Sequence, residues 1–421
     1  MTTSHSPFTN AQRFANPALR KQAEICIVGN GAIAKTAALA FSQAGQSVLL
    51  LVPVTPAPNK AVVPSWDVRV YALNHTAFHL LSGLKVWGAL DGARVEAVEG
   101  MQICGDGNAN ANTLPGQAGK LGFDAFAAHV ENLAYIVEDS NLNQALDAAL
   151  KFASNVEIVA GRATAMQIDV DAAQVLLDDD CVLSAKLLIG ADGAQSWVRS
   201  QADIDFDFRS YRQQGIVSNF SCEVAHHGIA RQWFTGSQGI VALLPLPGKQ
   251  VSLVWSAPQA LADKIMQESA DQLAERVSQV SAHVLGRLQA LQPESVRAFP
   301  LSLMRPHAVS APRIALIGDA AHVVHPLAGH GMNLGFADID ALLKAVLERE
   351  EQRDVGDERV LARYARSRKE EVLLMQMATD GLARLFELDL EPVRMVRNFG
   401  LNLLDKLPVL KRRLIAHAMG K

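Results

Sequence analysis

The stretch from residue 24 to residue 52 constrains the fold of this chain more than any other part of the sequence. Residues 24–29 (EICIVG) form an apolar run that ends in glycine and predict a buried strand. Residues 32–44 carry small and apolar side chains at helical spacing, and residues 47–52 (SVLLLV) predict a second buried strand. Strands joined in this way through a helix run parallel, with a right-handed connection. The sequence therefore predicts an α/β fold that opens with a βαβ unit.

The turn between the first strand and the helix has the spacing of a dinucleotide-binding motif, and it reads Gly29, Asn30, Gly31, Ala32, Ile33, Ala34. Gly29 allows a tight turn, Gly31 lets the backbone approach a pyrophosphate, and Ala34 replaces the third glycine that packs helix on strand. The N-terminus of the helix offers free N–H groups to phosphate. Val52 and Pro53 stand where the second strand usually ends in an acid that binds ribose. We therefore expect either another ribose contact or weaker nucleotide binding.

Size and composition limit the classes of protein to consider. The chain has 421 residues, which is more than one hydrophobic core usually covers, so two closely packed domains are expected. Hydrophobic residues make up 49% and charged residues 19%, which excludes a disordered chain. The net charge of −4 creates no field that attracts nucleic acid, so we expect no nucleic-acid partner. The four cysteines lie far apart in sequence, which favours a reducing compartment and predicts no metal site.

The predicted elements divide the chain into blocks. Residues 1–22 are polar, lack the apolar core of a signal peptide and are expected to be a flexible or loosely docked extension. The blocks that follow are a first domain over 23–200 that contributes to a second sheet near 70–130, an inserted antiparallel-sheet domain over 201–310, a return to the first domain over 311–350, and helices over 351–421. Residues 72–90 and 259–281 predict helices. No run approaches the roughly 20 apolar residues that span a bilayer.

Two later segments each follow a predicted strand. The first runs from Gly190 to Ala194 (GADGA), and an Asp-Gly pair in such a place is often only a turn. The second runs from Gly318 to Asn333 (GDAAHVVHPLAGHGMN) and is more specific. Its Asp319 stands at the carboxyl end of a strand, where ligands bind in open α/β sheets, and can accept hydrogen bonds from ribityl hydroxyls. The segment then leads into a helix whose N-terminus suits the negative charge of a reduced flavin.

In this order the three motifs resemble the aromatic-hydroxylase branch of FAD-dependent monooxygenases, and most closely its ubiquinone-biosynthesis hydroxylase family. The segments that carry the resemblance are Arg69 to Leu73, Gly190 to Arg199, Leu244 to Ser256, Gly318 to Gly335, and in the tail Arg363 to Lys369, Leu407-Pro408 and Ala418 to Gly420. It covers nearly the whole chain from about residue 24. Two positions depart from the family pattern: Val52 replaces an acid, and the usual GQG reads Gly329-His330-Gly331.

The resemblance implies the fold and the reaction. The expected fold is a Rossmann-like FAD-binding domain of the aromatic-hydroxylase type, with an inserted antiparallel β-sheet substrate domain and a helical C-terminus. The expected cofactors are FAD, NADPH or NADH as reductant, and O2 as co-substrate. A flavin C4a-hydroperoxide would then hydroxylate the ring of a polyprenyl phenol in ubiquinone biosynthesis. A dry, apolar pocket is expected, because water would discharge that intermediate.

The resemblance also assigns site residues. The expected cofactor contacts are Gly29, Asn30, Gly31, Ala32, Ile33 and Arg69 on the phosphate and ribityl side, Asp192 towards flavin or NADPH, and Asp319, Gly329, Gly331, Met332 and Asn333 around the ribityl chain and ring. The substrate-pocket candidates are Pro326, Leu327, His325 and His330. His322 and His325 are candidate acid–base groups, although a structural role is an open alternative. No general base is assigned.

Three questions stay open at this stage. The substrate could be a small soluble aromatic instead of a polyprenyl phenol. The chain could be a non-catalytic scaffold of a ubiquinone-biosynthesis complex, since Val52 and His330 depart from the pattern; proteins of that complex are expected partners. Residues 406–415 (KLPVLKRRLI) combine basic and apolar residues and could rest on an anionic membrane or dock on the core. The expected location is cytoplasmic, with peripheral contact to the inner membrane.

Overall fold

We describe a computed structural model of the chain, which covers residues 9–54, 66–105, 119–325 and 330–387 together with Asn398 and Asn402. Its first sheet is built around the expected βαβ unit and has the strand order β18-β19-β11-β1-β2-β8, with β10 and β9 attached to β11. The strands of this sheet are β1 (Leu19–Val28), β2 (Val48–Val52), β8 (Val156–Ala160), β9 (Ala163–Ile168), β10 (Ala173–Leu177), β11 (Cys181–Gly190), β18 (Ser310–Ala311) and β19 (Ile314–Leu316). Strands β8, β2, β1, β11 and β19 run parallel, as the βαβ unit requires.

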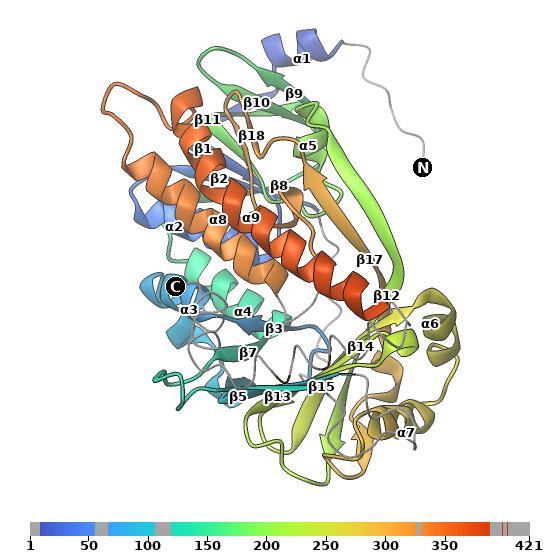
Figure 1. Cartoon of the computed structure of the whole chain (residues 1–421). Coiled ribbons are helices and arrows are strands. Elements are labelled where there is room, and N and C mark those ends of the chain that lie inside the picture. Colours follow the sequence, from blue (N-terminus) through green and yellow to red (C-terminus); the bar gives the residue numbers. More distant parts are fainter. Residues whose placement is uncertain are drawn as a thin grey trace.

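Helices cover one face of this sheet (Figure 1). They are α2 (Ala32–Gln43), α3 (His75–Gly83), α4 (Asp139–Leu150), α8 (His330–Leu347) and α9 (Glu358–Glu387). Ala34, Ala37 and Ala38 of α2 are fully buried, and small side chains at these positions let the helix lie close to the sheet and to α4 and α8. The long α9 lies along α8 (Figure 1). The short α5 (Trp197–Gln201) follows β11. No helix in the described part of the chain is long and apolar enough to cross a membrane.

The second sheet has the order β16-β12-β15-β14-β13-β5-β6, with β17 paired to β12. Its strands are β5 (Gly100–Cys104), β6 (Lys120–Asp124), β12 (Phe206–Cys222), β13 (Ile229–Phe234), β14 (Ile240–Leu246), β15 (Gln250–Pro258), β16 (Leu288–Ala290) and β17 (Arg297–Pro306). Helices α6 (Gln259–Ile265) and α7 (Ala270–Val280) cover the face that carries Phe220, Trp233 and Trp255. Strands β12 and β17 form a long ribbon that reaches the first sheet (Figure 1).

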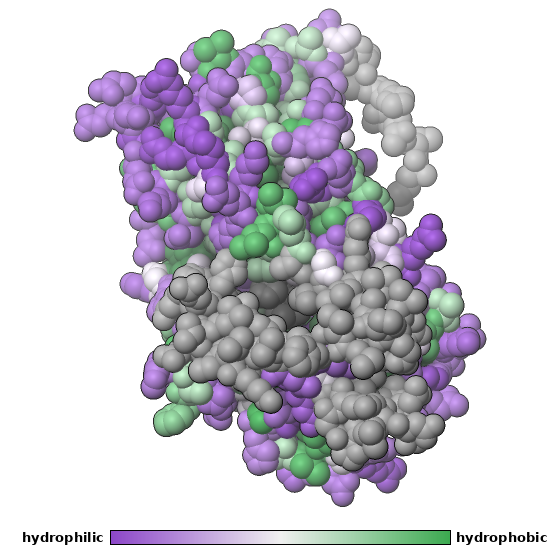
Figure 2. All heavy atoms as spheres, viewed as in Figure 1, coloured by the Kyte–Doolittle hydropathy of each residue, from purple (hydrophilic) through white to green (hydrophobic). Residues whose placement is uncertain are grey.

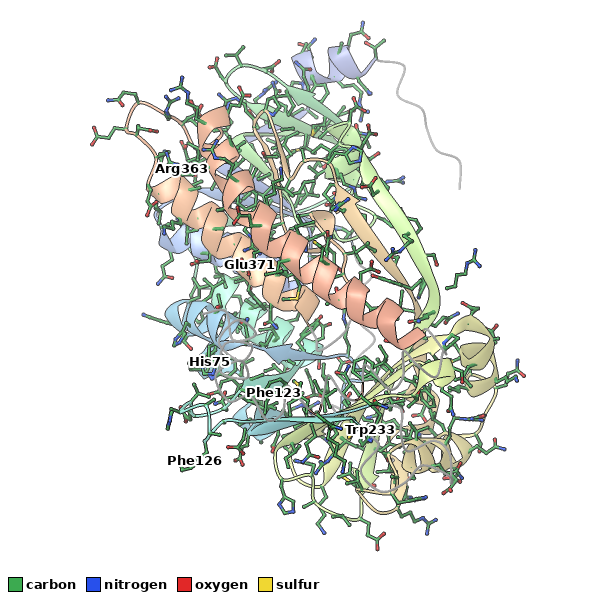
Figure 3. The ribbon with its side chains drawn as sticks, viewed as in Figure 1. His75, Phe123, Phe126, Trp233, Arg363 and Glu371 are labelled. Carbon is green, nitrogen blue, oxygen red and sulfur yellow. The ribbon has the colours of Figure 1, made fainter. Side chains whose placement is uncertain are left out.

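A small third sheet lies between the other two (Figure 1). It consists of β3 (Val70–Leu73), β7 (Ala134–Glu138) and β4 (Val95–Val98), in the order β3-β7-β4. Val98 and Ile136 of this sheet pack against Ala230 and Leu246 of the second sheet. Phe123 of β6 shares that side, because it pairs with Met101, which in turn pairs with Ala230 (Figure 3). The second sheet therefore presents one face to its own helices and the other to the rest of the molecule.

Residues 9–22 differ from the expected flexible extension. They form α1 (Asn10–Ala15) and the first part of β1. Thr9 caps α1 in a capping box with Gln12, and Phe14 is buried in a small apolar cluster. Arg13 forms an ion pair with Asp180. The contacts of Phe14 and Arg13 join groups far apart in sequence, which is why composition alone did not indicate them.

Candidate functional site

The carboxyl ends of the parallel strands bring the three sequence motifs to one edge of the first sheet. Val28 at the end of β1 pairs with Gly190 at the end of β11, and Gly190 pairs with Leu316 of β19. Two backbone hydrogen bonds continue this alignment, from Ala191 N to the Val28 carbonyl (2.9 Å) and from Ile317 N to the Gly190 carbonyl (3.0 Å). Ligands in open α/β sheets bind at such an edge. This edge is therefore the candidate site.

Only one of the two glycines of the first turn, Gly29, is required by the backbone conformation and packing of the fold. Gly29 has a φ of 147°, and a Cβ there would lie 2.3 Å from the Ala191 carbonyl oxygen, so the fold itself requires glycine. Gly31 is the N-cap of α2 with a φ of −81°, and a Cβ there would meet nothing within 4 Å. Among the described residues, no side chain caps this helix N-terminus. Its first N–H groups are therefore not taken up by a capping side chain there, which is the arrangement that binds phosphate.

Ile33 joins the first motif to the third. A Cβ on Gly318 would lie 3.2 Å from the Ile33 side chain, and a Cβ on Gly335 would lie 2.8 Å from it. The two glycines therefore make room for Ile33 where α2 meets the Gly318 turn and α8. The Ile33 side chain serves this packing contact, and any contact with a cofactor would be left to its backbone.

Asp319 follows directly on Gly318, and its side chain is accessible to solvent. The surrounding protein raises its pKa by desolvation, while His322 and Arg69 oppose that rise. Arg69 in turn has a raised pKa: burial lowers it, but Tyr71, Asp139 and Asp319 outweigh that effect. Asp319 and Arg69 therefore lie near enough to influence each other. An accessible carboxylate in such surroundings can accept a hydrogen bond from a ligand hydroxyl.

Asn333 is buried, and its amide group bonds to the backbone on either side of the β3–α3 junction. Its Nδ2 donates to the Ala72 carbonyl (2.8 Å), and its Oδ1 accepts from Asn74 N (3.0 Å). The residue thereby ties the first turn of α8 to the segment that contains Arg69. The sequence predicts that Asn333 contacts the flavin, but it gives no sign of these two hydrogen bonds to the β3–α3 segment. The neighbouring Met332 packs at the border of the core.

The second motif connects backbone segments. Asp192 Oδ2 accepts from Trp197 N (2.7 Å) and Val198 N (3.1 Å), which caps α5. Its Oδ1 is buried and has no hydrogen-bond partner in the part of the chain described. Arg199 is buried and donates to the carbonyls of Ala320 (3.0 Å) and Ala194 (2.7 Å), so it fastens the second motif to the third.

Two histidines of the third motif, His322 and His325, are buried. His322 Nε2 lies 2.6 Å from Asp338 Oδ2, and His325 Nε2 lies 3.2 Å from Gln213 Oε1 on β12. Burial lowers the pKa of His325 from 6.5 to about 4, a shift that Asp380 opposes, so this imidazole is neutral near pH 7.

The structure describes only some of the other candidate residues of the third motif. Gly331 lies in the first turn of α8 with open space around it. His330 begins α8, and its side chain is not described. Pro326, Leu327 and Gly329 lie outside the described residues. Val52 ends β2 at the site edge, as expected, so no acid stands there.

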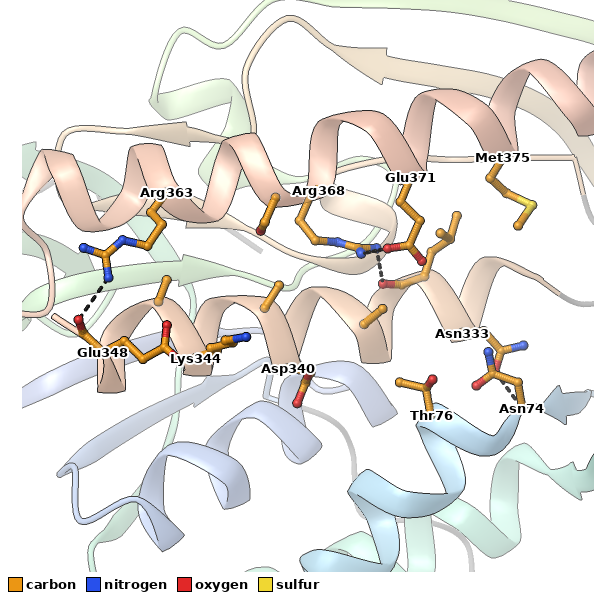
Figure 4. Close-up of a pocket in the computed structure, with 15 residues that line it drawn as sticks. Asn74, Thr76, Asn333, Asp340, Lys344, Glu348, Arg363, Arg368, Glu371 and Met375 are labelled. Atoms are coloured by element: carbon orange, nitrogen blue, oxygen red, sulfur yellow. Dashed lines mark hydrogen bonds and ion pairs between the residues drawn. The ribbon is translucent and has the colours of Figure 1, made fainter. Parts of the chain in front are cut away.

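A groove of about 380 Å³ lies between α8 and α9 (Figure 4). Its lining includes Asn74, Asn333, Lys344, Arg363 and Glu371. It shares Asn333 with the expected site, but the glycine turn and Asp319 do not line it. Charged residues border much of it, whereas a hydroxylase needs a dry pocket for its ring substrate. We therefore place the functional site at the strand ends and not in this groove.

A family model and the sequences of characterised relatives both match this chain over most of its length. Residues 22–378 match the family described as "FAD binding domain". The chain is 34% identical to 3-demethoxyubiquinol 3-hydroxylase of Escherichia coli over 94% of this chain and 98% of that one. It is 30% identical to ubiquinone hydroxylase UbiL of Rhodospirillum rubrum over 95% and 90% of the two chains.

Solved structures agree in fold. PqsL from Pseudomonas aeruginosa superposes with a TM-score of 0.73 at 22% identity, covering 90% of this chain and 100% of that one. p-Nitrophenol 4-monooxygenase PnpA from Pseudomonas putida gives a TM-score of 0.73 at 16% identity, covering 95% and 98%. The expected fold is confirmed. FAD is the cofactor, and the chain is an oxidoreductase of the aromatic monooxygenase type. It belongs to the family of FAD-dependent hydroxylases that includes these ubiquinone-biosynthesis enzymes.

Proposed function

We propose that this chain hydroxylates the aromatic ring of a polyprenyl phenol intermediate of ubiquinone biosynthesis. The observation that carries the proposal is the 34% identity to 3-demethoxyubiquinol 3-hydroxylase over 98% of that enzyme. Bound FAD, reduced by NAD(P)H, supplies the activation of O2 and the transfer of one oxygen atom to the ring. The protein's own residues bind and orient FAD and the phenol substrate, and they exclude water from the site.

The residues at the strand ends fit the parts of FAD. The N-terminus of α2 at Gly31 would hold the pyrophosphate, because no side chain of the described residues caps it and a Cβ on Gly31 would meet no described atom within 4 Å. Asp319 would accept a hydrogen bond from a ribityl hydroxyl. Arg69, which interacts electrostatically with Asp319, would supply positive charge near the ribityl hydroxyls and phosphates of FAD.

The inner face of the second sheet carries an apolar strip that suits an apolar substrate, bordered by the polar Gln232, Ser252 and Ser256. Val217, Val254 and Ala242 are neighbours across β12, β15 and β14, on the face turned away from α6 and α7. None of these three side chains has a titratable group or can form a hydrogen bond with water. His325 bonds to Gln213 of the same β12, so the third motif contacts this sheet at His325. In Figure 2, by contrast, mainly hydrophilic side chains cover the described surface of the α8–α9 half in this view.

The test compares lipid extracts of a strain that lacks the gene with extracts of the same strain carrying the wild-type chain or Asp319→Ala. We expect the deletion strain to lose ubiquinone and to accumulate a polyprenyl phenol that lacks one hydroxyl. Wild type should restore ubiquinone, and Asp319→Ala should restore much less. The accumulated precursor identifies the ring position. Unchanged ubiquinone, or accumulation of a small soluble aromatic, would refute the proposal.

Purification tests the scaffold alternative. We expect the wild-type protein to be yellow and to show the absorbance bands of bound flavin. A colourless protein that takes up no FAD would favour a non-catalytic scaffold.

We further propose peripheral membrane contact through residues 406–415, since a polyprenyl substrate partitions into lipid. These residues lie outside the described part of the chain. The proposal is supported by their mixture of Lys406, Lys411, Arg412 and Arg413 with apolar neighbours. Contact with other proteins of a ubiquinone-biosynthesis complex is a related proposal, which co-purification from the native membrane tests.

A further inference from the structure

Asp338, a buried carboxylate on α8, receives hydrogen bonds from three separate segments. Its Oδ2 accepts from Gly318 N (2.9 Å) and from His322 Nε2 (2.6 Å), and its Oδ1 accepts from Arg368 Nε of α9 (2.7 Å). Asp338, His322 and Arg368 are each at most 4% exposed. The pKa of Asp338 is lowered: burial alone would raise it, but His322 and Arg368 outweigh that effect. The carboxylate is therefore ionised and fully partnered.

This arrangement is more than an ion pair that stabilises the fold. Buried ion pairs contribute little net stability, because desolvation offsets their attraction. The bond to Gly318 N is different, since it holds a backbone position. Gly318 has a φ of 61°, in the left-handed region. The N–H groups of Ala321 and His322 return to its carbonyl, at 2.8 and 3.0 Å. Asp338 thus holds both ends of the short turn from Gly318 to His322, and this turn carries Asp319.

Helix α9 holds the same turn at two points. Tyr364 is fully buried, and its hydroxyl donates to the Leu316 carbonyl of β19 (2.7 Å), two residues before Gly318. Arg368, one turn later on α9, bonds to Asp338 and also to the Leu334 carbonyl (3.3 Å). Two residues of α9, each more than 40 positions beyond Asp319 in the chain, therefore fix the strand and the turn on which Asp319 sits.

We propose that Asp338 is a positioning residue of the FAD site: it fixes the Gly318–His322 turn so that Asp319 meets the cofactor, and it links that turn to α9. This inference rests on the proposed role of Asp319 towards FAD. It assigns a function to the Asp338–His322–Arg368 cluster, whose members are buried behind the turn that carries Asp319.

The experiment titrates apoprotein with FAD and follows the quenching of flavin fluorescence. The variant is Asp338→Asn, which keeps the shape but cannot accept from all three donors. Its matched control is Asp340→Asn, the same change two residues later on an exposed position of α8. We expect Asp338→Asn to raise the dissociation constant of FAD about tenfold, the effect of one lost charge-assisted hydrogen bond, and the control to leave it unchanged. Circular dichroism and the thermal midpoint of each apoprotein report folding separately.

A double-mutant cycle separates positioning from mere stabilisation. If Asp338 acts through Asp319, Asp338→Asn will weaken FAD binding little further in an Asp319→Ala background. Additive effects, or a dissociation constant unchanged by Asp338→Asn, would overturn the inference. If Asp338→Asn does not fold, Tyr364→Phe replaces it in the cycle, because it removes only the hydroxyl bond to Leu316; we expect a smaller effect with the same non-additivity, and additivity again overturns the inference. Failure of the wild type to bind FAD would instead contradict the proposed function.

Discussion

At the scale of single residues, His325 shows how a buried titratable group can join two parts of the molecule. It bonds to Gln213 and packs edge-on against Tyr211, with ring centroids 4.9 Å apart, both on β12. Its Nδ1 has no hydrogen-bond partner within the described residues. A protonated imidazole would add a buried charge and an unsatisfied donor here, which is why its pKa falls to about 4.

This pKa predicts a pH dependence of stability. The unfolded histidine takes up a proton below about pH 6.5, whereas the folded one does so only near pH 4. Stability from this group is therefore complete above pH 6.5 and falls as the pH drops towards 4. We expect wild type to lose up to about 3 kcal/mol of unfolding free energy across that window relative to His325→Gln. Urea unfolding at several pH values measures it, with exposed His79→Gln as the control. Parallel curves for wild type and His325→Gln would contradict the prediction.

The structure adds structural roles to site residues whose cofactor contacts stay predictions. The motif positions lie at the strand ends. Asn333 and Asp192 also form hydrogen bonds with backbone groups of other segments. Those partners are close only after folding. Asp338 was missed, although a signal existed: it lies four residues from Leu334 and Leu342, on the apolar face of its helix. A lone acid on such a face must find partners, but the sequence does not say which.

At the scale of elements, the β1–α2 turn separates what the fold needs from what the ligand needs. Gly29→Ala forces a Cβ to 2.3 Å from a backbone oxygen at a positive φ, so we expect a loss of more than about 3 kcal/mol or failure to fold. Gly31→Ala meets no atom and has an ordinary φ, so the apoprotein should change by less than about 1 kcal/mol. Its methyl group would nevertheless occupy the space where a pyrophosphate approaches the backbone.

We therefore expect Gly31→Ala to weaken FAD binding at least about tenfold while keeping the unfolding midpoint of the apoprotein. Thermal unfolding and fluorescence titration measure the two effects. An unchanged dissociation constant for FAD would show that the pyrophosphate does not pass over Gly31.

Elements with strong local signals were predicted closely. The helix expected over 32–44 is α2 at Ala32–Gln43, and the strand expected over 47–52 is β2 at Val48–Val52. Residues 72–90 were expected to be one helix but start in β3, and α3 begins only after Asn74, whose side chain accepts from Ala77 N. The helix expected over 259–281 is two helices, because Ser269 starts α7 with its own capping box. Capping side chains set these boundaries more sharply than apolar periodicity does.

At the scale of the whole molecule, the segment around Asp67 joins the second and third sheets near the site. Glu138 of β7 is fully buried and bonds to Asp67 N (2.5 Å) and to Arg94 (2.6 Å). Asn219 of β12 donates to the Asp67 carbonyl (2.9 Å). Arg69 follows two residues later, so its position depends on the second and third sheets as well as on the first.

Membrane contact is a prediction at this scale, because it concerns the whole surface. Each basic residue near an anionic bilayer contributes about 1 kcal/mol of attraction. We expect a chain that ends at Lys406 to float less with anionic vesicles than the full chain does. Replacing Lys411, Arg412 and Arg413 by glutamate should have the same effect without removing residues. Equal flotation of all three forms would contradict the proposal, and equal FAD content would show that the variants are intact.

The sequence by itself determined the βαβ opening, the order of the motifs and the family, because these depend on local patterns of glycine, apolar residues and charge. The tertiary structure decided that residues 9–22 are ordered, that Ile33 fits against Gly318 and Gly335, and that Asp338 holds the turn that carries Asp319. These three features depend on contacts that form only in the folded chain. Some join residues distant in sequence, and others join a turn to the helix that follows it. The partners in such contacts are chosen by the packing of the whole core, and no local pattern records that choice.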